Sequence, residues 1–413
     1  MRVLILTQIV VYPADAGPKI KTLQVMRHLA VEHEIVYCTF VRNLKEHQEA
    51  EQLSELCSRI STVPIRRSRV GDARFLLESL VSGDSFLLHR DDRSAMHVMV
   101  NRLLQEEHID ILHVDQLNMM RFVPPDWSGK VILDEHNAVW QVVERLRKGT
   151  HNPLTRWLLR REVELVRRLE GEACRRAHTV LAVSEQDRRA LQEVAGESVP
   201  IEIVPITVNV EELETIWMAR NPQKNRLLTV GTMFWPPNSE GIIWWLRKGY
   251  EKLQSMCPDL TYDIVGARPP RKVQKLARHC KGVNLHGYVA DIVPFWTNAV
   301  ALVVPILSGG GIRVKILEAM AMGIPIISTT IGCEGLAVRD GEHLLIADTP
   351  ETFAHACAML LRDQELAHYL TQNARRVVLE QYNSKAALRG LDSTYEQLFR
   401  REISEGVSET GSR

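Results

Sequence analysis

Residues 303–329 have the sequence VVPILSGGGIRVKILEAMAMGIPIIST, which is the most informative segment of the chain about its fold. The apolar run Val303–Leu307 predicts a buried strand, and Gly309–Gly311 predict a turn from that strand into a helix. Successive glycines leave the turn without Cβ atoms, so backbone N–H groups and the helix N-terminus can approach a phosphate directly. The sequence therefore predicts an α/β domain with an anion site at this corner.

The helix after the glycines carries charged side chains that suit a phosphate and a sugar. In a regular helix Lys315 and Glu318 lie about 60° apart on one face, whereas Arg313 falls on nearly the opposite face. Arg313 therefore reaches a phosphate only where the first turn is still loop. The plain alternative is a solvated ion pair between Lys315 and Glu318 on a packing helix.

Strand-like and helix-like segments alternate from the first residue, which is the pattern of parallel sheets flanked by helices. At 413 residues the chain is longer than one hydrophobic core usually serves, so we expect two domains. A polar break at 221–225 separates two series of strands, and we place the boundary between about Glu214 and Arg226. The expected strands are 3–7, 34–39, 111–114, 131–134, 179–183 and 201–204, then 227–231, 261–265, 283–286, 300–304 and 326–328.

Residues 305–330 resemble the donor-binding segment of the retaining GT-B glycosyltransferases of family 4, most clearly in Glu318–Ile327. Weaker resemblance extends over nearly the whole chain, at Gly17, Asp134–Asn137, Val183–Asp187 and Gly287–Asp291. It implies an α/β protein of the GT-B fold, in which two Rossmann-like parallel-sheet domains face a central cleft. A C-terminal helix would cross back to the first domain.

The resemblance also implies a division of labour between the domains. Residues 1–218 would bind the acceptor and residues 219–383 would bind the nucleotide sugar. Residues 384–413 would form the crossover helix, over 384–400, and a polar tail.

His136 is the best catalytic candidate because it follows an expected strand, at the end where α/β folds keep their reactive groups. By itself such a histidine is more often a satisfied polar residue; the match to the family's Asp-x-His segment raises it. In the family the leaving diphosphate helps to take the acceptor's proton, and the protein stabilises the charge on the diphosphate. His136, Lys315, Arg313 and the N–H groups of Gly310 and Gly311 suit that task.

Two departures from the family pattern stand out. The family's paired glutamates are eight positions apart, and the position eight before Glu318 is Gly310. The family's arginine and lysine after the first strand of the second domain correspond to Thr232 and Asn238, which are uncharged. We infer that Arg313 and Lys315 supply the missing positive charge.

The loop after the first strand contains Asp15, Gly17 and Lys19, and a helix is expected to begin near Pro18. By resemblance this loop faces the donor sugar, whereas an ordinary turn explains Asp15 and Lys19 equally well. Asp15 as a general base would instead suit an inverting enzyme, which keeps the stereochemistry open.

The nucleoside pocket is implied by resemblance at Gly266 and Tyr288, and the sequence does not identify the base. The chain contains no Asp-x-Asp pair, no GxGxxG fingerprint and no GxxxxGK[ST] loop. We therefore expect no metal and no cofactor, with a nucleoside diphosphate sugar as co-substrate.

Charge and cysteine content bound the partners and the compartment. Lysine plus arginine and aspartate plus glutamate both number 51, so no global field attracts nucleic acid. Seven scattered cysteines without a CxxC pair fit buried thiols in a reducing cytoplasm. Met1–Thr7 predicts a strand rather than a signal peptide, and no apolar run is long enough to span a membrane.

Residues 155–176 predict an arginine-rich amphipathic helix, in which Leu159, Val163, Val166, Leu169 and Ala173 follow helical spacing. Docking on anionic lipid at the inner face of the membrane is one interpretation. Glu162, Glu164, Glu170 and Glu172 dilute the charge, so we favour a solvated helix packed on the first domain. Residues 66–93 are expected to shape the acceptor pocket.

The expected function is transfer of a hexose-type sugar from a nucleoside diphosphate donor to a saccharide or lipid-linked acceptor. Retention is the expected stereochemistry, and a cell-surface polysaccharide or glycolipid is the expected product. Two alternatives stay open. The first is a GT-B nucleotide-sugar 2-epimerase; the second is a catalytically silent partner that binds nucleotide sugars, because Gly310 stands where the family has a glutamate.

Overall fold

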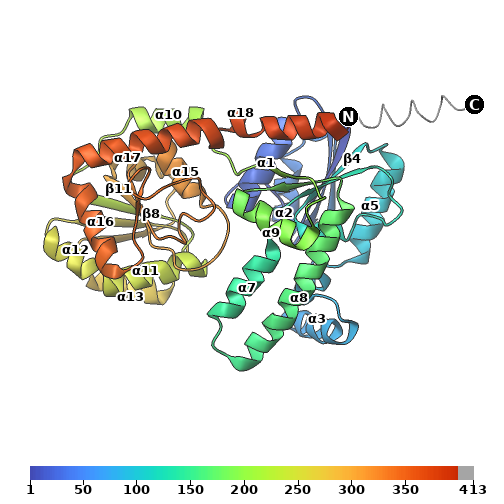
Figure 1. Ribbon diagram of the computed structural model, residues 1–413, viewed down its shortest axis with the longest axis horizontal. Helices are drawn as coiled ribbons and strands as arrows, with labels where there is room; N and C mark the ends of the chain where they lie inside the picture. Colours follow the sequence, from blue (N-terminus) through green and yellow to red (C-terminus); the bar gives the residue numbers. More distant parts are fainter. Residues whose placement is uncertain (399–413) are drawn as a thin grey trace, which may run out of the picture. The chain divides into compact units, whose positions relative to one another are not determined.

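The computed structural model describes residues 1–398 of the chain, which divides into two compact units. Among the described residues, the first unit comprises 1–206 and 388–398, and the second comprises 207–387. The chain therefore begins in one unit, builds the other completely and then returns to the first (Figure 1). Each unit is an α/β layer structure, as the alternating sequence pattern predicted.

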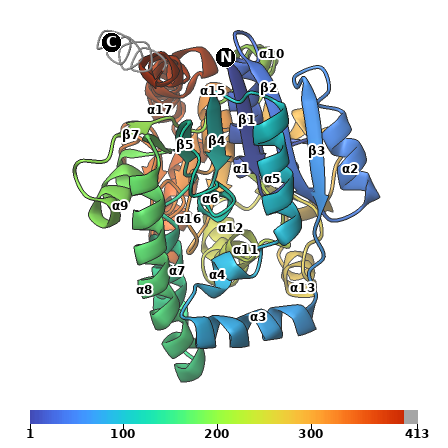
Figure 2. The same cartoon turned by 90° about the vertical axis from the view of Figure 1, so that its right-hand side faces the viewer.

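The first unit is built on a seven-stranded parallel sheet with the strand order β3-β2-β1-β4-β5-β6-β7. Figure 2 looks onto this unit, with helices on both sides of the sheet. The strands are β1 (Arg2–Thr7), β2 (Glu34–Val41), β3 (Arg59–Pro64), β4 (Ile111–Asp115), β5 (Lys130–Asp134), β6 (Thr179–Ala182) and β7 (Ile201–Ile203). The helices are α1 (Gly17–Leu29), α2 (Leu44–Glu51), α3 (Arg69–Ser82), α4 (Phe86–His89), α5 (Ser94–Glu106), α6 (Leu117–Met120), α7 (Val139–Gly149), α8 (Pro153–Arg176) and α9 (Glu185–Ala195).

The second unit has a six-stranded parallel sheet with the order β10-β9-β8-β11-β12-β13. Its strands are β8 (Arg226–Val230), β9 (Thr261–Val265), β10 (Val283–Gly287), β11 (Ala301–Val304), β12 (Ile326–Ser328) and β13 (Leu345–Ile346). Its helices are α10 (Val210–Met218), α11 (Pro236–Lys248), α12 (Tyr250–Met256), α13 (Arg271–His279), α14 (Val293–Asn298), α15 (Val314–Ala321), α16 (Pro350–Arg362), α17 (Gln364–Val377), a π-helical turn (Val378–Tyr382) and α18 (Ser384–Ala387).

Both sheets are buried on their two faces, which explains why their central strands are continuous apolar runs. In β1, Val3 and Ile5 belong to one core cluster, whereas Leu4 and Leu6 belong to the cluster on the other face. This is the alternation that a strand imposes on its side chains. The face with Val3 and Ile5 also buries apolar residues of the returning chain, including Leu391.

Both strand orders have a point where the sheet changes direction, between β1 and β4 in the first unit and between β8 and β11 in the second. At such a point consecutive connections run to opposite faces, which opens a crevice at the carboxyl ends of the strands. The loops after β8 and β11 contain Thr232 and Gly310, and Gly17 is the first residue of the helix that follows β1. The fold thus places predicted site residues at the edges where α/β proteins bind ligands.

The expected strands are all present, but the sequence analysis missed β3 and β13. β3 is an edge strand with only two of its six residues buried, so it lacks a continuous apolar run, and β13 has only two residues. The C-terminal helix expected at 384–400 is interrupted: α18 ends at Ala387 and residues 389–398 are helical again. The last two residues of that expectation and the expected polar tail lie outside the described residues.

Gly241 offers a test of the packing between α11 and the loop after β11. A Cβ at Gly241 would lie 2.0 Å from the carbonyl oxygen of Pro305, which is backbone and cannot rotate away. Gly241→Ala should therefore destabilise the second unit by about 1–3 kcal/mol, although alanine normally favours a helix. Gly149→Ala is the matched control, because a Cβ at the end of α7 meets nothing within 4 Å.

The measurement is the midpoint of thermal unfolding of the full chain. We expect a clear drop for Gly241→Ala and no drop for Gly149→Ala. Equal midpoints for both variants would contradict the packing.

Candidate functional site

In the first unit, a buried group of charged side chains lies at the carboxyl ends of β4 and β5. Asp115 and Asp134 are the last residues of these strands, and His136 follows two residues later. Lys21 comes from α1, and each of these four side chains is no more than 3% exposed. These four residues are called the edge cluster below.

The edge cluster is held together by ion pairs and hydrogen bonds. The Lys21 ammonium pairs with Asp134 Oδ1, and His136 Nε2 lies 3.0 Å from Asp115 Oδ1. Thr22, the neighbour of Lys21 on α1, donates its hydroxyl to Asp115 Oδ1 at 2.8 Å. Burial alone would raise the pKa of Asp134, but the Lys21 ammonium and the nearby His113 outweigh it and hold this pKa well below its usual value.

The returning C-terminal helix is connected to the edge cluster through His113 of β4. His113 Nε2 lies 3.4 Å from Asp134 Oδ2, and its Nδ1 lies 2.8 Å from the hydroxyl oxygen of Tyr395. Both His113 and Tyr395 are buried. A residue near the end of the chain therefore supports the carboxylate that follows β5.

Three side chains of the edge cluster are close enough together to bind a metal ion. Asp115, Asp134 and His136 each offer a ligand atom, and these atoms lie within 4.8 Å of one another. The Lys21 ammonium already pairs with Asp134, so a positive charge is built into the chain at this point. Of the edge cluster, the sequence analysis named His136 alone as a catalytic candidate, and it missed Lys21 and Asp115. Their signal was weak, because each needs a partner more than 90 residues away in the chain.

The loop before α1 places the other first-unit candidates. Asp15 Oδ1 pairs with Lys19 Nζ at 3.0 Å, and Lys19 also donates to the carbonyl oxygen of Pro13 at 3.3 Å. Gly17 is the first residue of α1, with Pro18 in the first turn, as expected. The ion pair engages both charged candidates with each other, which favours a role in the turn.

In the second unit, Lys315 lies at the crevice between β8 and β11. From α15 its Nζ donates to the carbonyl oxygen of Val230 at 2.7 Å and to Asn238 Oδ1 at 3.0 Å. The Asn238 amide nitrogen in turn donates to the carbonyl oxygen of Thr232 at 3.0 Å. Thr232, Asn238 and Lys315, which were predicted separately, are thus brought together into one group.

Gly231 leaves the space that Lys315 needs to reach the carbonyl oxygen of Val230. A Cβ at Gly231 would lie 2.8 Å from Lys315 Nζ, and its φ of 153° is unfavourable for other residues. Gly266 serves the same corner, because a Cβ there would lie 1.8 Å from the carbonyl oxygen of Gly231. The predicted donor residue Gly266 therefore has a packing role between the loops after β8 and β9.

The charge on Lys315 is poorly compensated within the unit. Both of its hydrogen-bond acceptors are neutral oxygens rather than carboxylates. Burial, and then the nearby Arg313, lower the pKa of Lys315 to about 7, while Glu318 acts in the opposite direction. Burial raises the pKa of Glu318. The plain alternative, a solvated ion pair between Lys315 and Glu318, is not what forms, because the ammonium turns inward to the carbonyl oxygen of Val230 and to Asn238.

Arg313 lies in the loop before α15, as the sequence analysis required for it to reach a phosphate. α15 begins at Val314, so Arg313 is the residue before the helix and has an extended backbone. Its guanidinium donates to the carbonyl oxygens of Gly310 and Gly311. Gly309 and Gly311 have φ of 97° and 81°, a region that favours glycine.

The contacts of Arg313 with the glycine carbonyls determine which N–H groups of the loop can bind a ligand. In a trans peptide the C=O and the next N–H point in opposite directions. Because the carbonyls of Gly310 and Gly311 face the guanidinium, the N–H groups of Gly311 and Ile312 point away from it. The sequence analysis had named the N–H groups of Gly310 and Gly311.

Exposed aromatic side chains surround this edge of the second unit. Phe234 and Trp235, which follow β8, are 51% and 58% exposed, and Tyr288, after β10, is 80% exposed. The Arg268 guanidinium stacks 4.1 Å from the centre of the Phe234 ring. Phe234 and Trp235 were not predicted as site residues; their signal was two aromatic residues in a loop directly after a buried strand.

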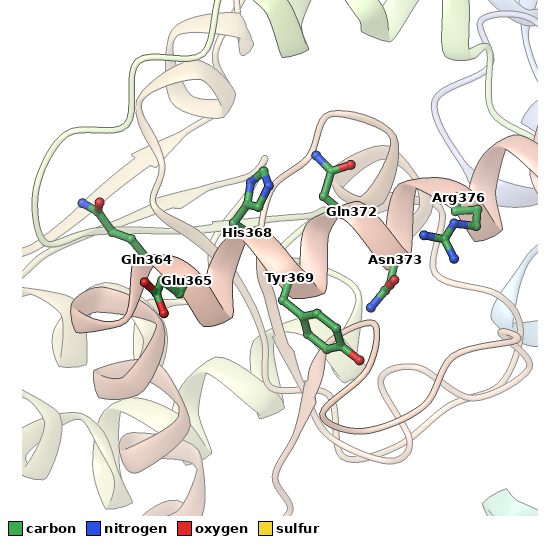
Figure 3. A pocket seen from close by; sticks show the side chains of 7 residues that line it. All are labelled: Gln364, Glu365, His368, Tyr369, Gln372, Asn373 and Arg376. Carbon is green, nitrogen blue, oxygen red and sulfur yellow. The ribbon is translucent and has the colours of Figure 1, made fainter.

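A hollow elsewhere in the second unit contains none of the predicted site residues. Its volume is about 590 Å³, and Figure 3 shows that its lining side chains all come from one helix, α17. They are Gln364, Glu365, His368, Tyr369, Gln372, Asn373 and Arg376. Since these positions recur every three to four residues, they form one face of the helix, and we do not assign a site there.

Comparisons with known proteins agree in both halves of the chain. A family model described as Glycosyltransferase Family 4 matches residues 24–212, and one described as Glycosyl transferases group 1 matches residues 224–363. An uncharacterised 44.6 kDa protein in the cps region of Klebsiella pneumoniae is 28% identical over 166 residues. That match covers 38% of this chain, and the chain spans 43% of the length of that relative.

Two solved structures show the similarity of the fold. A sucrose-phosphate synthase from Thermosynechococcus elongatus superposes with a TM-score of 0.68 at 16% identity, covering 97% of this chain and 100% of the other. The Anabaena protein HepE, solved with UDP and glucose, gives a TM-score of 0.66 at 13% identity over 96% of this chain and 100% of its own. Both likenesses cover the two units.

The Lys21–Asp134 ion pair yields a prediction about stability. Lys21→Met leaves the Asp134 carboxylate buried without its ammonium, so the free energy of unfolding should fall by about 3–5 kcal/mol. Lys19→Met, two residues earlier on α1, removes an ion pair whose Asp15 side chain is 67% exposed and should cost no more than about 1 kcal/mol. Urea unfolding of both variants measures the difference; similar losses would argue against a buried ion pair.

Proposed function

The chain belongs to the group 1, family 4 glycosyltransferases of the GT-B fold, and we propose that it transfers a sugar from a nucleoside diphosphate sugar to a hydroxyl acceptor. The observation that carries this proposal is the position of Lys315. Its ammonium reaches from α15 to the loop after β8, at the crevice of the second sheet, and is held there by neutral acceptors.

A diphosphate is the ligand that this arrangement fits best. The Lys315 ammonium and the Arg313 guanidinium supply positive charge, and the N–H groups of Gly311 and Ile312 supply hydrogen-bond donors. The family pattern places charged residues at Thr232 and Asn238, and Asn238 instead binds the Lys315 ammonium through its amide oxygen. Lys315 of α15 and Arg313 just before this helix would supply the positive charge that the loop lacks, in line with the relocation inferred from the sequence.

The remaining parts of the donor and the acceptor are assigned by the same reasoning. Exposed Phe234, Trp235 and Tyr288 offer stacking faces for a nucleoside base. We propose that Glu318, one turn after Lys315 on α15, binds hydroxyl groups of the sugar. We propose that the first unit binds the acceptor, and that His136, fixed by Asp115, acts on the transferred group. The Asp15–Lys19 pair makes Asp15 a poor general base, which supports transfer with retention.

The biological setting is proposed from the relatives and the thiols. The Klebsiella pneumoniae relative lies in a cps region, which supports a role in building a cell-surface polysaccharide. All seven cysteines are unpaired, which supports a cytoplasmic location. A hexose donor and a saccharide or lipid-linked acceptor complete the proposal.

The experiment that tests this proposal is a thermal-shift screen against UDP, GDP, ADP, CDP and dTDP, followed by assays with the matching nucleotide sugars. The diphosphate that binds tightest should raise the melting temperature most, by the mass-action dependence of stability on ligand. Transfer should release nucleotide only when an acceptor is supplied, whereas a 2-epimerase would act on the nucleotide sugar alone. A chain that shows a thermal shift but no turnover on the whole panel would fit the catalytically silent partner instead, and a chain that shows neither would contradict the proposal.

Lys315 makes donor binding depend on pH. Since its pKa in the free protein is about 7, the ammonium is largely charged below pH 7 and loses its charge as the pH rises above it. A nucleoside diphosphate sugar keeps its two negative charges throughout this range, so affinity should weaken from about pH 6.5 to about pH 8.5, by up to roughly tenfold. Binding should also take up protons near pH 7.5.

Calorimetry in two buffers with different ionisation enthalpies measures this proton uptake. Lys315→Arg keeps a positive charge at every pH of the series and should flatten the profile. Lys315→Met should weaken binding at least tenfold at pH 6.5 and leave the melting temperature of the free protein unchanged or higher, because a poorly compensated ammonium is removed. A wild-type affinity that does not change with pH would rule out this role of Lys315.

A further inference from the structure

The beginning of α8 is not packed like the rest of the helix. Beyond Arg161, the helix buries Val163, Val166 and Ala173 against the first sheet. In contrast, all residues from Asn152 to Trp157 are exposed, and Leu154 and Trp157 are exposed by 67% and 58%. Leu146, near the end of the preceding α7, is also 60% exposed. The turn between α7 and α8 therefore presents large apolar side chains to solvent.

α3 presents an apolar stripe of its own. Val70, Leu77 and Val81 are 82%, 64% and 90% exposed. At about 100° per residue these three positions fall within roughly 40° of one another around the helix. Arg74 lies on the same side, with 78% of its side chain exposed. Solvent-facing stripes of this kind are unusual unless they contact another molecule.

α3 and α8 are joined at the same end of the first unit. In Figures 1 and 2 both α3 and the turn between α7 and α8 lie at the end away from the sheet. The Arg161 guanidinium of α8 donates to the carbonyl oxygen of Ser79 near the end of α3, and to Ser79 Oγ at 3.2 Å. Residues Val70, Leu77, Val81, Leu146, Leu154 and Trp157 are called the tip surface below.

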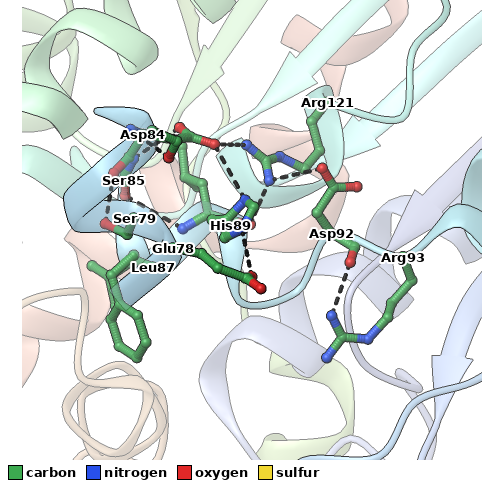
Figure 4. A network of polar contacts seen from close by, with 12 residues as sticks. Glu78, Ser79, Asp84, Ser85, Leu87, His89, Asp92, Arg93 and Arg121 are labelled. Atoms are coloured by element: carbon green, nitrogen blue, oxygen red, sulfur yellow. Dashed lines mark hydrogen bonds and ion pairs between the residues drawn. The ribbon is translucent and has the colours of Figure 1, made fainter. Parts of the chain in front are cut away.

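A polar network keeps α3 in this position (Figure 4). Ser79 Oγ donates to the carbonyl oxygen of Asp84 at 2.7 Å, and the Arg121 guanidinium contacts Asp84 Oδ2 at 3.2 Å. Behind it, Glu162 accepts hydrogen bonds from Ser85 Oγ at 2.6 Å and from the N–H of Leu87 at 2.9 Å, at the start of α4. The exposed stripe is therefore carried by a fixed element.

The α7–α8 part of the tip surface is rich in positive charge, although the chain as a whole is neutral and α3 contains two arginines and two acidic residues. Residues 142–161 contain six lysines and arginines and one glutamate, against 51 of each sign in the whole chain. The sequence analysis assumed that the glutamates of α8 dilute this charge. Two of them point inward instead: Glu162 binds the start of α4, and Glu170 accepts the N–H groups of Val139 and Trp140 at the start of α7.

We propose that the tip surface docks on a membrane that contains anionic lipid. Leucine, valine and tryptophan side chains would enter the boundary between head groups and acyl chains, and arginines such as Arg156 and Arg160 would contact the phosphates. Within residues 1–398 no helix is both long enough and apolar enough to cross a bilayer. Docking in this way goes beyond the proposed sugar transfer and does not depend on which donor is used.

The test is sedimentation of the full-length protein with phosphatidylcholine vesicles, with and without about 30 mol% phosphatidylglycerol. We expect binding at least tenfold stronger to the anionic vesicles, weakened when salt rises from about 0.1 M to about 1 M. The double variant Leu154→Glu, Trp157→Glu should lower binding about tenfold or more. Arg156→Gln with Arg160→Gln should lower it only on anionic vesicles.

The matched control replaces Val31, on the α1–β2 turn, and Val98, on α5, by glutamate. These valines are 81% and 67% exposed, so the change in charge and in exposed apolar surface is comparable. The control should bind vesicles like the parent, and every variant should keep the parent's melting temperature and its stabilisation by nucleoside diphosphate.

The proposal is overturned if the protein ignores vesicles of both compositions, binds both equally, or loses binding as much in the valine control as in the tip variants. An intact nucleotide-induced shift in any of these cases leaves the glycosyltransferase proposal standing. If the protein bound anionic vesicles as expected but showed no nucleotide-induced shift, the glycosyltransferase proposal would fail and the docking proposal would stand.

Discussion

Parallel sheets covered on both faces impose the constraint on which this molecule depends. With helices packed on each side, the only places where polar groups can gather without breaking the core are the ends of the strands. Both sheets have the same order of outward-growing strands, so each has one crevice at its carboxyl edge, between β1 and β4 and between β8 and β11. The edge cluster of the first unit and Lys315 of the second lie at these two edges. The core fixes the strands, and the strands fix the site.

The two edges treat charge in opposite ways. In the first unit, Asp134 is neutralised by Lys21 inside the protein, and the pair is anchored through His113 to the C-terminal helix. A buried ion pair of this kind needs its full set of hydrogen bonds, which makes the edge cluster rigid. In the second unit, the hydrogen-bond acceptors of the Lys315 ammonium are neutral oxygens of Val230 and Asn238. A cation in that state gains most from an anionic ligand, which supports the proposal that the donor diphosphate binds at the second edge.

α8 shows how the surface of a helix can differ from its composition. Its sequence contains seven arginines and four glutamates, and the sequence analysis favoured a solvated helix whose glutamates dilute the positive charge. The structure turns Glu162 and Glu170 inward, where each accepts N–H groups at the start of another helix. A carboxylate at a helix N-terminus satisfies otherwise unpaired donors and interacts favourably with the helix dipole. Arg156 and Arg160, in the first two turns of α8, stay exposed to solvent. The electrostatic potential at this end of the helix is therefore positive.

The sequence by itself determined the class of fold, nearly all of the strands and the glycine corner before α15, because buried strands and glycine turns leave local patterns in the chain. It also determined that Arg313 would matter only if the helix began after it, and α15 does begin at Val314. Tertiary structure decided the rest: that Lys21 meets Asp134, that Lys315 reaches Val230 and Asn238, and that two glutamates of α8 face inward. These contacts join residues that are 30 to more than 100 positions apart, and a long polar side chain can turn to either face of its helix. Which way it turns depends on the partner that the folded chain brings close, and no local pattern records that.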